Sequence, residues 1–120
     1  MNTNMKEQLH TIMPELPMDN VPAAVAWYRD VLGFSVNYEQ HDIGVMDRDK
    51  VRVLLIARTE KHTGIGSCYI YVHDADALYA ELRGKGVNIS HEPISRPWGL
   101  REFPVLDQEG NRITFGQPFE

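Results

Sequence analysis

The chain has 120 residues, a formal net charge of −5 and a single cysteine. This length supports one domain with a modest core, and one cysteine excludes an internal disulfide. The acidic balance argues against a nucleic-acid partner, which requires concentrated Lys and Arg, and it suits a cationic small molecule better. The longest apolar run is too short to cross a bilayer and the first ten residues lack the apolar segment of a secretory signal, so we expect a soluble, cytoplasmic protein without a membrane partner.

The chain begins with a polar segment, an edge strand and a helix. Residues 1–8 are polar and are expected to be frayed. Residues 9–18 favour a first strand, and their two prolines confine it to a sheet edge because proline cannot donate to a ladder. Asp19 or Asn20 would cap the helix that follows, and Gly33 would end it. Apolar residues at helical spacing form one face of this helix: Val21, Ala24, Val25, Tyr28 and Leu32.

Three strands should follow this helix. Segments 34–39 and 51–57 have strand composition, and 43–46 is a shorter strand before a turn at 47–50. The loop-like stretch 59–66 then marks the midpoint of the fold.

The second half repeats the pattern. Segment 67–72 predicts a strand, Asp74 caps a second helix, and 87–90 predicts another strand. Segment 96–115 then predicts a hairpin with turn residues at 107–111. The apolar face of the second helix is expected to contain Ala75, Leu78, Tyr79 and Leu82.

The repeat predicts two tandem βαβββ modules, at about 9–58 and 66–118, within one domain at 9–118. The resulting α+β fold would have a curved, incompletely closed mixed sheet with both helices outside it. Curved sheets form clefts, and a chain this short does not close its own cleft. We therefore expect a homodimer with sites shared between subunits.

Trp98 stands at the mouth of the predicted hairpin, between Pro97 and Gly99. At such a position an indole presents a flat face to a ligand or fills the core. Both interpretations stay open at this point.

Three stretches together resemble the vicinal oxygen chelate superfamily of glyoxalases, bleomycin-resistance proteins and extradiol dioxygenases. They are PAAVAWYRDVLGF at 22–34, YVHDADALYAEL at 71–82 and RPWGLREFPVLDQEGNRITF at 96–115. The resemblance spans residues 12–117 and is greatest to the bleomycin-resistance proteins. It implies a non-enzymatic homodimer with two interface clefts, which sequester a cationic glycopeptide antibiotic by stacking its planar bithiazole on aromatic rings. The implied partner is thus a bleomycin-like ligand, free or as a metal chelate.

Carried over by position, the resemblance implies that the ligand contacts Trp98 and Tyr69, with Tyr38 and Ile43 on the facing loop region. We add Tyr71, an aromatic residue of the same predicted strand as Tyr69, to the expected ligand contacts. Ile43 departs from the family pattern, which often has an aromatic ring there. Losing one stacking ring weakens binding by about 1–3 kcal/mol.

The metal-ligand positions of the superfamily enzymes fall here on Met13, Ser67 and Thr114. These side chains are poor donors for zinc, nickel or iron(II), so we predict no metal, no cofactor and no catalytic residue. The alternative is a metal-dependent glyoxalase-type lyase or dioxygenase with displaced ligands, in which a register slip would use His10. A further possibility is a sensor or partner module for a different ligand.

Overall fold

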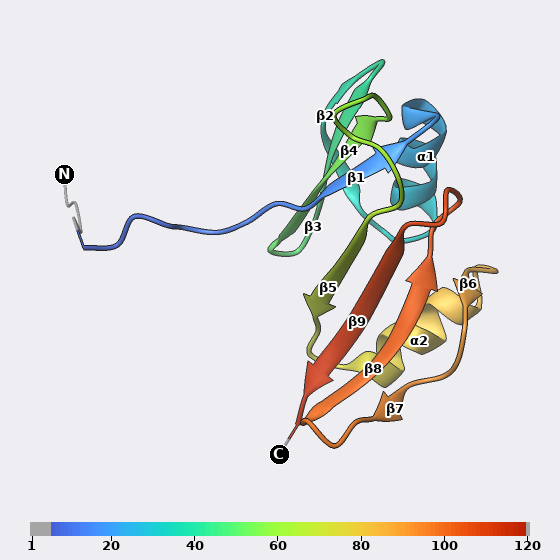
Figure 1. Cartoon of the computed structure of the whole chain (residues 1–120). Coiled ribbons are helices and arrows are strands. Elements are labelled where there is room, and N and C mark those ends of the chain that lie inside the picture. The colour runs from blue at the N-terminus through green and yellow to red at the C-terminus, as the bar shows by residue number, and fades with distance from the viewer. Residues whose placement is uncertain (1–5, 120) are drawn as a thin grey trace.

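The computed structural model describes residues 6–119 and contains two β-sheets, each with one helix packed beside it (Figure 1). Sheet 1 has the strand order β1-β4-β3-β2 and carries helix α1. Its elements are β1 (Glu15–Met18), α1 (Val21–Asp30), β2 (Ser35–Gln40), β3 (Ile43–Arg48) and β4 (Val51–Ala57). Neither helix in the described part of the chain has the length and apolar character needed to span a membrane.

Sheet 2 has the strand order β5-β9-β8-β6, with β7 also paired to β8, and carries helix α2. Its elements are β5 (Ser67–Tyr71), α2 (Ala75–Arg83), β6 (Asn88–Ile89), β7 (Ile94–Ser95), β8 (Leu100–Leu106) and β9 (Arg112–Pro118). The parallel pair β1–β4 in sheet 1 corresponds to the parallel pair β5–β9 in sheet 2. The predicted α+β class with a duplicated, unclosed arrangement is confirmed. The strands form two hydrogen-bonded sheets, one in each module.

The first strand is shorter than predicted. Strand β1 begins at Glu15 rather than at Leu9, although it does lie at a sheet edge as expected. Residues 6–14 leave the sheet as an extended arm, which projects away from the fold in Figure 1. Pro14 still accepts a hydrogen bond from the Leu54 amide but has no amide hydrogen to return. Of the predicted frayed segment 1–8, residues 1–5 lie outside the described residues.

Other boundaries also differ from the sequence prediction. Strand β3 continues to Arg48, because Asp47 and Arg52 face each other across the ladder and their side chains pair at 2.7 Å. The turn therefore narrows to Asp49 and Lys50. Helix α1 is capped by Asn20, whose Oδ1 accepts from the Ala23 amide at 3.0 Å, rather than by Asp19. The strand predicted at 87–90 shrinks to β6.

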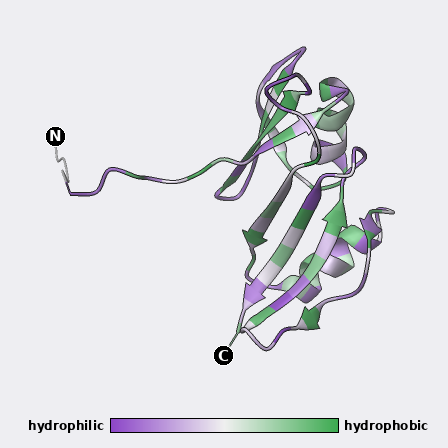
Figure 2. Ribbon diagram, in the orientation of Figure 1, coloured by the Kyte–Doolittle hydropathy of each residue, from purple (hydrophilic) through white to green (hydrophobic). Residues whose placement is uncertain are grey.

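The predicted helix faces form the core. The α1 residues assigned to one face, from Val21 to Tyr28, are all buried, and so is Leu32, which lies two residues beyond the end of the helix. In α2, Ala75 and Leu82 are fully buried while Leu78 and Tyr79 pack against the core at its edge. Figure 2 shows hydrophobic residues in the strands of both sheets, and hydrophilic segments in the turns that join them.

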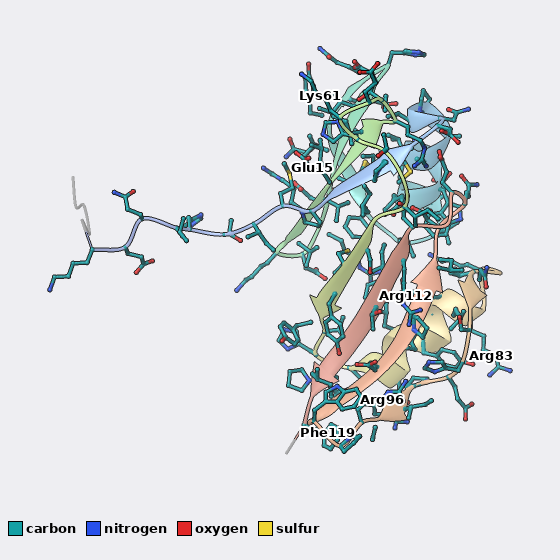
Figure 3. The ribbon with its side chains drawn as sticks, in the orientation of Figure 1. Glu15, Lys61, Arg83, Arg96, Arg112 and Phe119 are labelled. Carbon is teal, nitrogen blue, oxygen red and sulfur yellow. The ribbon has the colours of Figure 1, made fainter. Side chains whose placement is uncertain are left out.

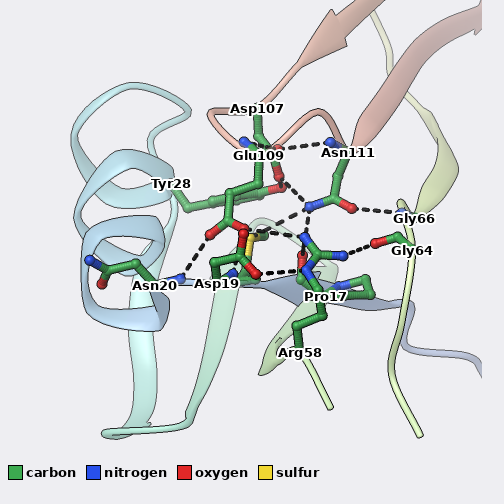
Figure 4. A network of polar contacts seen from close by, with 11 residues as sticks. Pro17, Asp19, Asn20, Tyr28, Arg58, Gly64, Gly66, Asp107, Glu109 and Asn111 are labelled. Carbon is green, nitrogen blue, oxygen red and sulfur yellow. Dashed lines mark hydrogen bonds and ion pairs between the residues drawn. The ribbon is translucent and has the colours of Figure 1, made fainter. Parts of the chain in front are cut away.

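A buried set of polar contacts, the polar junction, holds the two modules together (Figure 4). Its members are Tyr28, Arg58, Asp107, Glu109 and Asn111. The Asn111 side-chain amide donates to the Pro17 carbonyl of β1 at 2.9 Å, and its Oδ1 accepts from the Gly66 amide at 2.6 Å. Arg58 pairs with Glu109 and with Asp19. The Asp-x-x-Gly-Asn turn of the resemblance thus connects sheet 2 to sheet 1.

A second link joins the modules through Arg48. Its guanidinium makes two 3.0 Å hydrogen bonds to the Glu81 carboxylate of α2 and one of 2.8 Å to the Leu32 carbonyl. The hydrogen bond from Arg48 lowers the pKa of Glu81 below its ordinary value.

Candidate functional site

Two exposed tyrosines project from the face of sheet 2 opposite its buried side chains. Side chains alternate along a strand, so Tyr69 and Tyr71 share one face of β5 while Ile70 is buried on the other. Tyr69 is 40% exposed and Tyr71 69%. Their rings meet edge to face with centroids 5.5 Å apart. Together with Trp98 they form a surface that we name the aromatic patch.

Gly116 lets Tyr69 reach across the sheet. Strand β9 lies between β5 and β8, and the Tyr69 ring crosses it over Gly116 to donate a 2.9 Å hydrogen bond to Glu102 of β8. A Cβ atom at position 116 would lie 1.8 Å from the Tyr69 hydroxyl oxygen, so only glycine admits this path. Burial, followed by the hydrogen bond to Glu102, raises the pKa of Tyr69 to about 12.

Trp98 lies in the turn before β8 and is 64% exposed, so it does not fill the core. The following Gly99 has φ +87°, which places it in the left-handed region that favours glycine. The Arg96 guanidinium lies over the indole at 5.8 Å from the ring centroid, and its Nε atom is 3.6 Å from the Glu102 carboxylate. Figure 3 shows Arg96 near Phe119, at the end of sheet 2 remote from sheet 1.

The aromatic patch is therefore continuous through Arg96 and Glu102, two residues that the sequence analysis did not assign to the site. The side-chain partners of Glu102 are Tyr69 and Arg96. The sequence signal that could have identified Arg96 is the order Arg96-Pro97-Trp98, which places a cationic side chain two residues from an indole.

The other two predicted ligand contacts lie on sheet 1. Tyr38 of β2 is 49% exposed and faces Val45, while Ile43 of β3 is half-buried between Gln40 and Ile56. The structure thus gathers three of the predicted positions on sheet 2 and places two on sheet 1.

The superfamily metal-ligand positions do not form a donor set. Met13 lies on the extended arm, Ser67 begins β5 and Thr114 is buried within β9. His10 is exposed on the same arm as Met13. Among residues 6–119 no group of three or more His, Cys, Asp and Glu side chains is arranged to hold a metal ion.

A hollow of about 580 Å³ lies between the β3–β4 turn and helix α2. Apolar side chains including Leu32, Val51, Leu78 and Phe115 line it, and the Arg48–Glu81 pair stands at its wall. Tyr71 is the only predicted ligand contact among its lining residues.

Comparison with known proteins places the chain in one protein family. The model of the Glyoxalase/Bleomycin resistance protein/Dioxygenase superfamily matches residues 8–115. A bleomycin resistance protein from Geobacillus stearothermophilus is 24% identical over 124 residues, covering 88% of this chain and 94% of its own length.

Solved structures agree with this result. The bleomycin-binding protein from bleomycin-producing Streptomyces verticillus, crystallised with copper(II)-bleomycin, has 26% identity and a TM-score of 0.79, over 95% of this chain and 99% of its own. Lactoylglutathione lyase from Agrobacterium tumefaciens matches in fold, with 21% identity and a TM-score of 0.77, over 92% of this chain and 96% of its own. By sequence and by architecture, the chain belongs to the glyoxalase/bleomycin resistance protein/dioxygenase superfamily.

Proposed function

We propose that this protein binds a planar, cationic small molecule of the bleomycin type and does not transform it. The observation that carries the proposal is the aromatic patch: Tyr69 and Tyr71 are exposed and in edge-to-face contact, and exposed Trp98 is linked to Tyr69 through Arg96 and Glu102. The relatives that carry a bleomycin-resistance or bleomycin-binding name support this ligand class.

Stacking and charge supply the affinity. A flat heteroaromatic ring against an aromatic side chain contributes about 1–3 kcal/mol per ring in comparable base-stacking sites. The net charge of −5 attracts a cationic ligand over longer distances and raises its association rate.

The site is shared by two copies of the chain in this proposal. Tyr38 and Ile43 on sheet 1 would face the aromatic patch of a second subunit, which completes the set of predicted contacts. The exposed arm supports such an assembly, because Leu9 and Ile12 are 91% and 86% exposed and gain from burial against a partner. Sedimentation equilibrium should give twice the mass of one chain, whereas a monomer at micromolar concentration would remove the shared site.

Ligand binding is tested by fluorescence in a variant with one tryptophan. Trp27→Phe removes the half-buried indole of α1 and leaves the emission to Trp98. Micromolar bleomycin should quench this emission saturably, with one drug per subunit. In calorimetry Trp98→Ala should weaken binding at least tenfold while Trp27→Phe leaves it unchanged. Equal affinity of wild type and Trp98→Ala would contradict the proposal.

The metal-enzyme alternative has its own readout. Elemental analysis of protein purified without chelator should find no stoichiometric transition metal, and mass spectrometry should recover the drug unchanged after incubation. Stoichiometric zinc, nickel or iron that is lost in His10→Ala would instead support displaced ligands.

A further inference from the structure

Trp98 is a strongly exposed side chain on a turn, yet one of its faces is already occupied. The turn backbone is closed by hydrogen bonds from the Arg96 amide to the Leu100 carbonyl at 2.7 Å and from the Gly99 amide to the Arg96 carbonyl at 3.1 Å. These bonds fix the backbone but leave the indole free to rotate. The contact that restricts the ring itself is the Arg96 guanidinium at 5.8 Å from its centroid.

We propose that Arg96, anchored on Glu102, holds the indole of Trp98 in place and leaves it a single free face, which accepts an uncharged flat ring rather than a cationic one. This inference rests on the proposed function and specifies its ligand further. The positive charge of the ligand would then lie on a group remote from the stacked ring.

The anchor is built from side chains that are partly shielded from water. The Glu102 side chain is 14% exposed, and the Arg96 Nε atom is buried and makes no hydrogen bond within the described residues. Tyr69 donates to the other carboxylate oxygen of Glu102, so the carboxylate is held from β5 as well. Glu102 therefore positions Arg96, and Tyr69 in turn positions Glu102.

The charge of Arg96 sets the selectivity. A cationic ring on the free indole face would lie within a few ångströms of the ring plane, with the guanidinium on the opposite side. The two like charges would then lie roughly 9 Å apart, and at the effective dielectric constant of a protein surface they still repel each other. An uncharged ring avoids this repulsion and keeps the full stacking contact. Arg96 is thus a specificity-determining residue in this proposal, and Glu102 is a positioning residue.

The first test uses no ligand. In the Trp27→Phe background, time-resolved fluorescence anisotropy of Trp98 should decay mainly with the tumbling of the whole protein. Arg96→Met and Glu102→Gln should each add a fast, sub-nanosecond component from a freed indole. Arg101→Ala serves as the control, because it removes a neighbouring arginine that pairs with Asp76 and not with the aromatic patch. Unchanged decays in both patch variants would overturn the positioning role.

The second test compares two probes: bleomycin, whose bithiazole ring is flat and uncharged, and ethidium, whose flat ring carries the charge. Wild type should prefer bleomycin, and Arg96→Met should shift the affinity ratio toward ethidium about tenfold. An unchanged ratio with both probes bound would overturn the selectivity. Failure of bleomycin to bind at all would refute the proposed function and the selectivity with it, whereas the anisotropy result would still decide the role of Arg96 and Glu102.

Discussion

The stretch 96–115 contains two carboxylates that each accept a hydrogen bond from a tyrosine, and the two sites differ in what surrounds that bond. Asp107 accepts from Tyr28 at 2.8 Å, and Glu102 accepts from Tyr69 at 2.9 Å. Asp107 is 7% exposed and also receives the Glu109 amide, the Asn111 amide and the Asn111 side chain. The Glu102 carboxylate accepts from the half-exposed Tyr69 side chain and lies 3.6 Å from the Arg96 guanidinium.

In our proposal this difference separates a site that stabilises the fold from a site that binds the ligand. The polar junction satisfies both oxygens of Asp107, so its bonds contribute to holding the modules together and leave no capacity for a ligand. The aromatic patch keeps its rings in water at a cost to the isolated chain, and such exposed apolar groups mark interaction surfaces. The same tyrosine–carboxylate bond therefore serves structure at one end of the hairpin and, in our proposal, recognition at the other.

The largest expected effect comes from Asp107→Asn. One carboxylate oxygen that accepts two donors becomes an amide that can only donate, so buried donors lose their acceptor. Unfolding in urea should show a loss of about 3 kcal/mol. The matched change at the other site, Glu102→Gln, should cost less than about 1 kcal/mol. Equal losses would erase the distinction between the two regions.

Gly116→Ala should affect binding rather than folding. The new methyl group overlaps the Tyr69 ring, a side chain that can swing away into solvent. Bleomycin affinity should fall about tenfold in calorimetry because Tyr69 leaves Glu102. Gly84→Ala is the control, since its Cβ would meet backbone atoms at ordinary distances of 3.8 and 4.0 Å. Unaltered affinity in Gly116→Ala would show that the crossing of Tyr69 over β9 is dispensable.

The smallest effect is the alkaline titration of Tyr69. Its folded pKa of about 12 lies above the unfolded value near 10, so its contribution to stability is present below about pH 10 and is lost as the pH rises toward 12. Tyr69→Phe should lower stability at pH 8 by about 0.5 kcal/mol and flatten the decline above pH 10. A decline as steep as that of wild type would assign the alkaline sensitivity elsewhere, for example to Tyr28, whose pKa is raised by burial.

The sequence predicted the parts of this molecule that follow from local patterning. Apolar residues at helical spacing, from Val21 to Tyr28, identified the buried face of α1, whereas the helix ends at Asp30, three residues before the predicted Gly33. The same approach wrongly predicted a strand in the arm, because Leu9 and Ile12 have strand composition but no strand lies beside them within the described chain. Strand length depends on a partner, and sequence composition does not supply one.

Of the candidate site, only the aromatic side chains could be predicted from the sequence. Trp98, Tyr69 and Tyr71 were predicted from the hairpin, the strand pattern and the family resemblance, whereas the neighbourhood of Arg96, Glu102 and Gly116 depends on the register of three strands. Tyr71 faces Gly116, and Gly116 in turn faces Glu102. No spacing along the chain reports that cross-strand neighbourhood. The turn at 107–111 was predicted from its residues. Its contact with the first module, from Asn111 to Pro17, was not.

A crystal structure of the protein with copper(II)-bleomycin tests the central claim most directly. We expect two unaltered drug molecules per dimer, each with its bithiazole stacked on the free face of Trp98 and with Tyr38 and Ile43 of the second subunit opposite. Drug bound in the hollow beside helix α2, with the aromatic patch left in solvent, would contradict this account.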